Sequence, residues 1–124
     1  MSTESNITIT LTAGAAIDQF ARVKLSAAKT VIEAVATDKA AYIGVAQTVA
    51  ASGEVVTVAL KGGYKTFKCI AEEALAVNAV LYAADAGKVK DTSNGNPIGT
   101  ALEAATADGD IIECILLDQV AVVV

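Results

Sequence analysis

Apolar side chains occupy every second position in three segments of the chain, residues 7–12, 55–60 and 111–116. The apolar positions are Ile7, Ile9, Leu11, Val56, Val58, Leu60, Ile112, Cys114 and Leu116. Successive side chains of a β-strand point to opposite faces, so this period of two predicts three strands that each have one apolar face. Thr57 and Glu113 fall on the opposite, polar face of their strands.

Further segments rich in β-branched residues lie between turn signals. They predict strands at residues 21–25, 30–35, 64–70, 79–83 and 120–124. Polar and glycine-containing stretches predict turns or loops at residues 13–17, 85–88 and 92–97. The run Ala71-Glu72-Glu73-Ala74 is the one place where we expect a single helical turn, because Ala and Glu favour helix.

Two halves of the chain have similar sequences. Residues 43–46 (IGVA) match residues 98–101 (IGTA), and residues 53–60 match residues 109–116. Upstream, the weaker matches are residues 23–25 with 80–82 and residues 30–31 with 88–89. The segment 100–105 contains strong helix formers, but its counterpart in the first half does not, so the repeat favours a strand there.

Composition limits the fold and the class of protein. The 124 residues are 54% hydrophobic but only 4% aromatic, so one domain with a core of Val, Ile, Leu and Ala is expected. We predict a mainly all-β fold, a small β-sandwich or β-barrel (β-tulip-like) with an internal two-fold repeat and an extended N-terminal arm. The arm is placed at residues 1–16 and the β-rich domain at residues 17–124.

Charge and residue types argue against several functions. The net charge of −5 comes without any dense basic block, which argues against nucleic acid as a partner. The sequence has neither a membrane-spanning apolar run nor a signal peptide, so synthesis in a cytoplasm and no membrane contact are expected. Histidine is absent, which removes Ser-His and Cys-His catalysis. Cys69 and Cys114 do not form a CxxC pair and are interpreted as buried free thiols, with a disulfide or a metal site as alternatives.

Other short motifs carry little chemistry. The segment Lys61–Lys65 lacks the spacing of a phosphate-binding loop, and residues 85–91 lack that of a calcium loop. The acid pairs at 72–73 and 108–110 are expected to face solvent. We therefore predict no catalytic, cofactor or metal site, and no enzyme.

The run AEEALAVNAVLYAADAGKVKDTSNGNPIGTALEAATADGDIIECILL resembles the phage capsid cement, or head decoration, proteins. The earlier run YIGVAQTVAASGEVVTVALKGG resembles the matching first-half segment, and the likeness spans residues 20–117. Asn78, in place of a more usual Gly, and the apolar tail QVAVVV depart from the family pattern. The resemblance implies a structural virion protein, often a trimer, that binds the major capsid protein on the outer surface of a phage head and stabilises it. It also implies an N-terminal arm that adds a strand to the capsid protein.

The polar tip and alternating strand at the N-terminus fit such an arm. An unpaired strand of this kind could add to a partner's sheet, with backbone hydrogen bonds for affinity and side chains for specificity. The predicted capsid-binding residues are Ile7, Thr8, Ile9, Thr10 and Leu11. The alternative is that this strand pairs within its own domain, for example with residues 120–124.

A rival function comes from Thr37-Asp38-Lys39-Ala40, which matches the DKA signature of lipoyl-carrier domains. Those domains are also two-fold repetitive β-sandwiches, and Lys39 would then lie at an exposed hairpin tip and carry the lipoyl group. The Gly-Asp run expected upstream of the lysine is missing. Another kind of β-sandwich interaction domain, or a different phage structural role such as a head fibre base or a tail module, is a further alternative.

Overall fold

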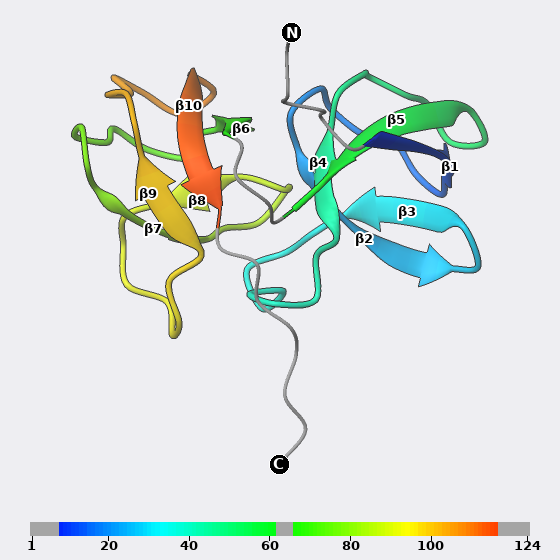
Figure 1. Ribbon diagram of the computed structural model, residues 1–124, viewed down its shortest axis with the longest axis horizontal. Helices are drawn as coiled ribbons and strands as arrows, with labels where there is room; N and C mark the ends of the chain where they lie inside the picture. The colour runs from blue at the N-terminus through cyan, green and yellow to red at the C-terminus, as the bar shows by residue number, and fades with distance from the viewer. Residues whose placement is uncertain (1–7, 62–65, 117–124) are drawn as a thin grey trace, which may run out of the picture.

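The computed structural model describes residues 8–61 and 66–116, and within them it forms ten strands and no helix. The strands of the first half are β1 (Thr8–Ala13), β2 (Arg22–Ala27), β3 (Thr30–Glu33), β4 (Gly44–Ala46) and β5 (Val55–Leu60). Those of the second half are β6 (Phe67–Ile70), β7 (Val80–Ala83), β8 (Val89–Lys90), β9 (Gly99–Ala101) and β10 (Ile111–Leu116). Each half is built from five consecutive strands, and the two halves lie side by side (Figure 1). The prediction of an all-β fold is confirmed.

The strands of the two halves are arranged in the same order around each unit, if β6 to β10 are taken as the counterparts of β1 to β5 and one order is followed in the opposite direction. The first half is a closed barrel with the order β1-β3-β2-β4-β5, in which β1 runs antiparallel to β5 and parallel to β3. The second half is a curled sheet with the order β6-β10-β9-β7-β8. A single parallel bridge from Ala71 to Val89 joins its two ends, as the pairing of Ala13 with Val31 joins β1 to β3.

Backbone hydrogen bonds recur at matching positions in the two units. Gly44 pairs with Leu60 in the barrel, and Gly99 pairs with Leu116 in the curled sheet. A Cβ atom at Gly44 would lie 2.1 Å from the carbonyl oxygen of Ala59, and one at Gly99 would lie 2.0 Å from that of Ile115. Both sites therefore require glycine, because the neighbouring backbone occupies the space of a side chain.

One matched pair from the sequence comparison is wrong by one residue. The sequence repeat matches Val23 with Val80, but Val23 pairs with Gly44 whereas Leu81 pairs with Gly99. Val23 therefore corresponds to Leu81, and Arg22 corresponds to Val80. A shift of one residue moves a side chain to the other face of its strand, and both Val23 and Leu81 are indeed fully buried.

The helical turn expected at residues 71–74 does not form. The N–H of Ala71 donates to the carbonyl of Asp110, and the N–H of Glu72 donates to that of Val89. These bonds to distant segments hold the chain extended and outweigh the local helix propensity. The segment 100–105 is not helical either, although β9 ends at Ala101 and only the bridge between Ala105 and Leu75 follows.

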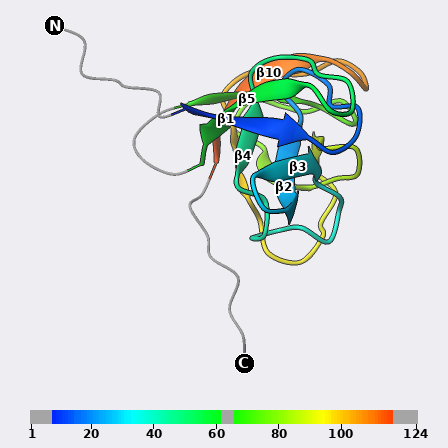
Figure 2. The same cartoon turned by 90° about the vertical axis from the view of Figure 1, so that its right-hand side faces the viewer.

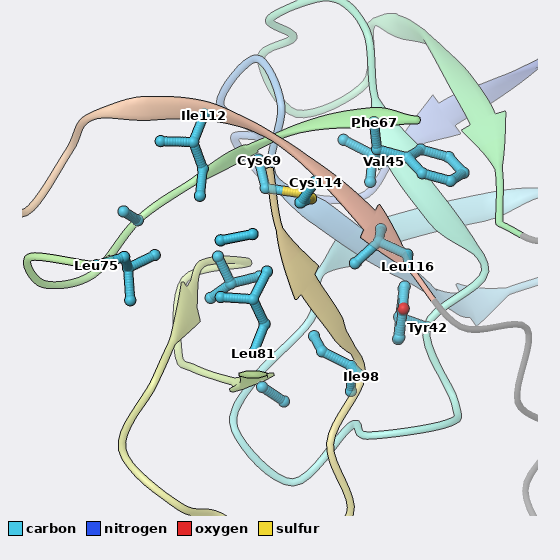
Figure 3. Packing of buried hydrophobic residues seen from close by; sticks show 14 of the residues in the cluster. Tyr42, Val45, Phe67, Cys69, Leu75, Leu81, Ile98, Ile112, Cys114 and Leu116 are labelled. Atoms are coloured by element: carbon cyan, nitrogen blue, oxygen red, sulfur yellow. The ribbon is translucent and has the colours of Figure 1, made fainter. Parts of the chain in front are cut away.

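The core consists of two clusters of mainly aliphatic side chains. One fills the barrel, and the other fills the curled sheet and extends to Val45, Ala59 and Tyr42 of the first half. Cys69 and Cys114 are free and fully buried in the second cluster, as predicted (Figure 3). The hydrogen bond with Cys69 is the larger cause, and the burial of Cys114 the second, of a raised pKa of the Cys114 thiol. This thiol therefore remains protonated.

Candidate capsid-binding site

The N-terminal half of β1 has one open edge. Thr8 through Thr12 pair with β5 along one side of the strand, but only Thr12 and Ala13 pair with β3 along the other. Within the described part of the chain, no strand lies along that other side of residues 8–11. Figure 2 shows β1 beside β5 at this side of the barrel.

The backbone groups that face the open edge belong to Thr8 and Thr10. The N–H of Thr12 donates to Lys29 on the β3 side, whereas the N–H of Ala13 donates to Glu54 on the β5 side. Because these directions alternate along a strand, the N–H and C=O of Thr8 and Thr10 point away from β5. Unpaired strand groups of this kind are a template for a strand from another chain.

Of the five residues predicted to bind a capsid, the structure describes four. Thr8, Ile9 and Thr10 are exposed, which leaves them available to a partner. Leu11 is buried in the core of the barrel, so its side chain packs within this domain. The described part of the predicted arm thus pairs within its own domain, and Ile7 and residues 120–124 lie outside the described residues.

A buried cation, Arg22, links the two halves. Its guanidinium donates to the carbonyl oxygens of Ala84 at 2.8 Å, Lys88 at 3.1 Å and Asp38 at 3.2 Å. Its Cζ lies 5.0 Å from the centre of the Tyr42 ring, within the range of a cation–π interaction. Burial lowers the pKa of Arg22 from its ordinary value, and nearby Tyr42, Cys69 and acidic groups oppose this effect.

Arg22 was not predicted from the sequence, although a signal was present. It is the only arginine of the chain, beside eight lysines. A planar guanidinium with five donors suits several buried carbonyl groups better than an ammonium does.

Lys39 does not occupy the tip of a hairpin. It lies in the connection between β3 and β4 and is half-buried. A Cβ atom at Gly95 would lie 2.6 Å from its Nζ, so the lysine side chain lies against the loop of the other half. Neighbouring Asp38 is buried and pairs with Lys24 at 3.0 Å. Lys39 is therefore not presented at an exposed hairpin tip, as a lipoyl-carrier domain would require.

Acidic residues from the pairs at 72–73 and 108–110 make hydrogen bonds and an ion pair that stabilise loops. Glu73 accepts hydrogen bonds from the backbone N–H groups of Asp91 and Thr92. Hydrogen bonds from the side chains of Asp91 and Thr92, together with these backbone bonds, lower the pKa of Glu73 to about 2. Asp108 pairs with Lys88 at 2.8 Å. Asp110 accepts bonds from Thr106 and Ala107 across a turn.

Neither a metal-binding cluster nor a membrane span is found in residues 8–61 and 66–116. No three His, Cys, Asp or Glu side chains there are grouped as metal ligands. The same residues include no helix that is long and apolar enough to cross a membrane.

Comparison with models of protein families assigns the chain to a family. The model of the phage cement protein family matches residues 1–116. The chain belongs to this family. It is therefore a structural protein of phage virions that binds the capsid, and the family is not one of known enzymes.

A solved structure has the same fold. The N base of the head fiber protein gp8.5 of bacteriophage phi29 superimposes with a TM-score of 0.70 at 16% sequence identity, over 93% of this chain and 97% of that chain. At this identity the likeness concerns the fold alone. The comparison with curated proteins gave no match.

Proposed function

We propose that this cement protein attaches to the outer surface of the phage head, as a homotrimer, by pairing the open edge of β1 with a strand of the major capsid protein. The observation that carries the proposal is the edge at Thr8 and Thr10, which no strand within residues 8–61 and 66–116 covers, in a chain of the cement family. Ile9 is 38% exposed beside this edge and supplies an apolar contact. Main-chain bonds give affinity in this mode of binding, and several subunits on one capsid add avidity.

Thr10→Pro tests the edge directly. Proline removes the N–H that faces the open edge but none of the bonds to β5, and proline is tolerated at edge positions of this kind. Thr10→Val is the matched control, because it changes the side chain and keeps the N–H. Capsids that lack the protein are mixed with each variant, and the bound fraction is measured by co-sedimentation.

We expect Thr10→Val to bind as the wild type does and Thr10→Pro to lose at least tenfold in affinity, which corresponds to about 1.4 kcal/mol for the lost backbone bond. Equal binding of both variants would show that the open edge is not the capsid contact. A wild-type chain that does not sediment with its capsid would overturn the proposal as a whole.

A further inference from the structure

The two halves of the chain are joined head to tail, because different surfaces of each half meet. Equivalent residues in the two halves are identified by their strand pairing. We define the covered face as Arg22, Val45 and Ala59, on the outside of the barrel, and the open face as Val80, Thr100 and Ile115, at the same positions of the curled sheet.

The second surface is one end of each unit. We define the covered rim as Phe67, Ala83 and Leu116 in the curled sheet, and the open rim as Ile9, Leu25 and Leu60 in the barrel. Ile9 pairs with Val58 as Phe67 pairs with Cys114, which makes these two residues equivalent.

Within the chain, the covered rim packs on the covered face. Phe67 and Leu116 belong to the same buried cluster as Val45 and Ala59, and Figure 3 shows the Phe67 ring beside Val45. All six residues are buried, Phe67 to 4% exposure and Arg22 to 0%.

The open rim and the open face have no such cover within the described residues, and they are largely exposed, with only Leu60 and Thr100 half-buried. In the open rim, Ile9 is 38% and Leu25 is 52% exposed. In the open face, Val80 is 48% and Ile115 is 43% exposed. Exposed aliphatic side chains that gather on one surface indicate an interface rather than ordinary scatter.

We infer that the open rim of one copy docks on the open face of the next copy, and thereby repeats between molecules the contact that already joins the two halves within each molecule. The inference rests on the proposed homotrimer for the number of copies. A head-to-tail contact leaves one rim and one face free until a ring closes, so three copies in a ring bury all of them.

The substitutions between the two faces fit this role. Val80 replaces Arg22 and Ile115 replaces Ala59, so the open face is uncharged and has aliphatic side chains at both positions. Thr100, which replaces Val45, is its one polar residue. Arg22 needs fixed carbonyl partners from the same chain, whereas an apolar face tolerates a partner that arrives from solution.

The test is the mass of the isolated protein, measured by light scattering without capsids. Leu25→Glu places a charge in the open rim, and Val80→Glu places one in the open face. Val49→Glu is the matched control, because Val49 is 70% exposed and lies outside both surfaces. Circular dichroism and thermal unfolding establish that each variant is folded.

We expect trimers for the wild type and Val49→Glu, and folded monomers for Leu25→Glu and Val80→Glu. An equal mixture of the two monomeric variants should form dimers and nothing larger, because the pair retains one intact rim and one intact face that match. A surface that pairs with its own copy would not give this result.

The contrary outcomes separate this inference from the proposed function. If both variants remain trimers, the trimer stands and the rim-to-face contact is wrong. If the variants are monomers that do not dimerise when one is titrated with an excess of the other, the two surfaces are not partners. A wild-type monomer overturns both the trimer and the contact, while capsid binding is judged by co-sedimentation alone.

Discussion

The barrel and the curled sheet have the same strand order and matching backbone bonds, yet opposite surfaces of the two are buried. The barrel buries its outer face and exposes its rim, whereas the curled sheet buries its rim and exposes its outer face. Backbone pairing alone therefore does not decide which surface is covered. The side chains on the two surfaces decide it, and Arg22 against Val80 is the clearest contrast.

Arg22 shows how specific this arrangement is. A guanidinium is costly to bury and is stabilised here by three carbonyl groups, two of which belong to the second half. Val80, at the equivalent position of the curled sheet, carries no donor, so these three bonds form only when the outer face of the barrel is the covered one. The buried cation thus favours one of two similar ways to join the halves.

The largest expected effect is at Arg22 and its counterpart. Arg22→Met should lower the free energy of unfolding by about 3–5 kcal/mol, because it leaves buried carbonyl groups without donors. Val80→Met, at the equivalent exposed position, should change it by less than about 0.5 kcal/mol. Urea unfolding measures both, and similar losses would contradict the assignment of Arg22 as the residue that fixes the interface.

Truncation of a side chain in the covered rim and in the open rim should change the free energy of unfolding by amounts that differ almost as much. Phe67→Ala removes a buried ring and should cost about 3–4 kcal/mol, whereas Ile9→Ala removes a partly exposed side chain and should cost about 1 kcal/mol in dilute protein. Denaturant unfolding at several protein concentrations sharpens this comparison. If a second copy covers the open rim, the loss of unfolding free energy caused by Ile9→Ala grows with protein concentration. In dilute protein, the loss caused by Phe67→Ala remains the larger of the two.

The two paired glycines should instead behave alike. Gly44→Ala and Gly99→Ala each place a Cβ atom against a backbone carbonyl, so we expect equal losses of about 2–3 kcal/mol. Gly53→Ala is the control, since no atom lies within 4 Å of its Cβ position and only its φ of +89° causes strain, at about 1 kcal/mol. Thermal unfolding of the three variants checks this, and a clear difference between Gly44 and Gly99 would argue against equivalent backbones.

The smallest effect is expected at Asp110, which closes a turn of the curled sheet. Hydrogen bonds from the Thr106 backbone and hydroxyl lower the pKa of Asp110, so its ionised form stabilises the folded state. This contribution is complete above the ordinary pKa of about 3.9 and is lost as the pH falls through the lowered value. Asp110→Asn should therefore melt slightly below the wild type at neutral pH, and the difference should vanish in acid.

Several features of the fold could be predicted from local sequence. The alternation at residues 55–60 and 111–116 predicts β5 and β10 at their observed places, and Asp85-Ala86-Gly87-Lys88 predicts a turn that forms. These predictions succeed because the period of two and the turn residues act over a few neighbours. The predicted helical turn at 71–74 does not form, because the N–H groups of Ala71 and Glu72 bind segments that are distant in the sequence.

The candidate site was predicted in part. The alternation at residues 7–12 identifies the strand, and the threonines at 8 and 10 are exposed as such a pattern requires. The sequence left open whether this strand pairs within its own domain. The partner β5 could not be identified, because the alternation indicates that one face is apolar but does not identify which sheet covers it.

The sequence by itself determined the all-β class, the thin aliphatic core, the buried thiols and the resemblance to cement proteins. Each of these follows from residue types or from contacts over short separations. The tertiary structure alone decided which edge of β1 is open, how Arg22 is buried and which rim and face remain exposed. Those features depend on how two similar units pack together, and the same local pattern is compatible with more than one such packing.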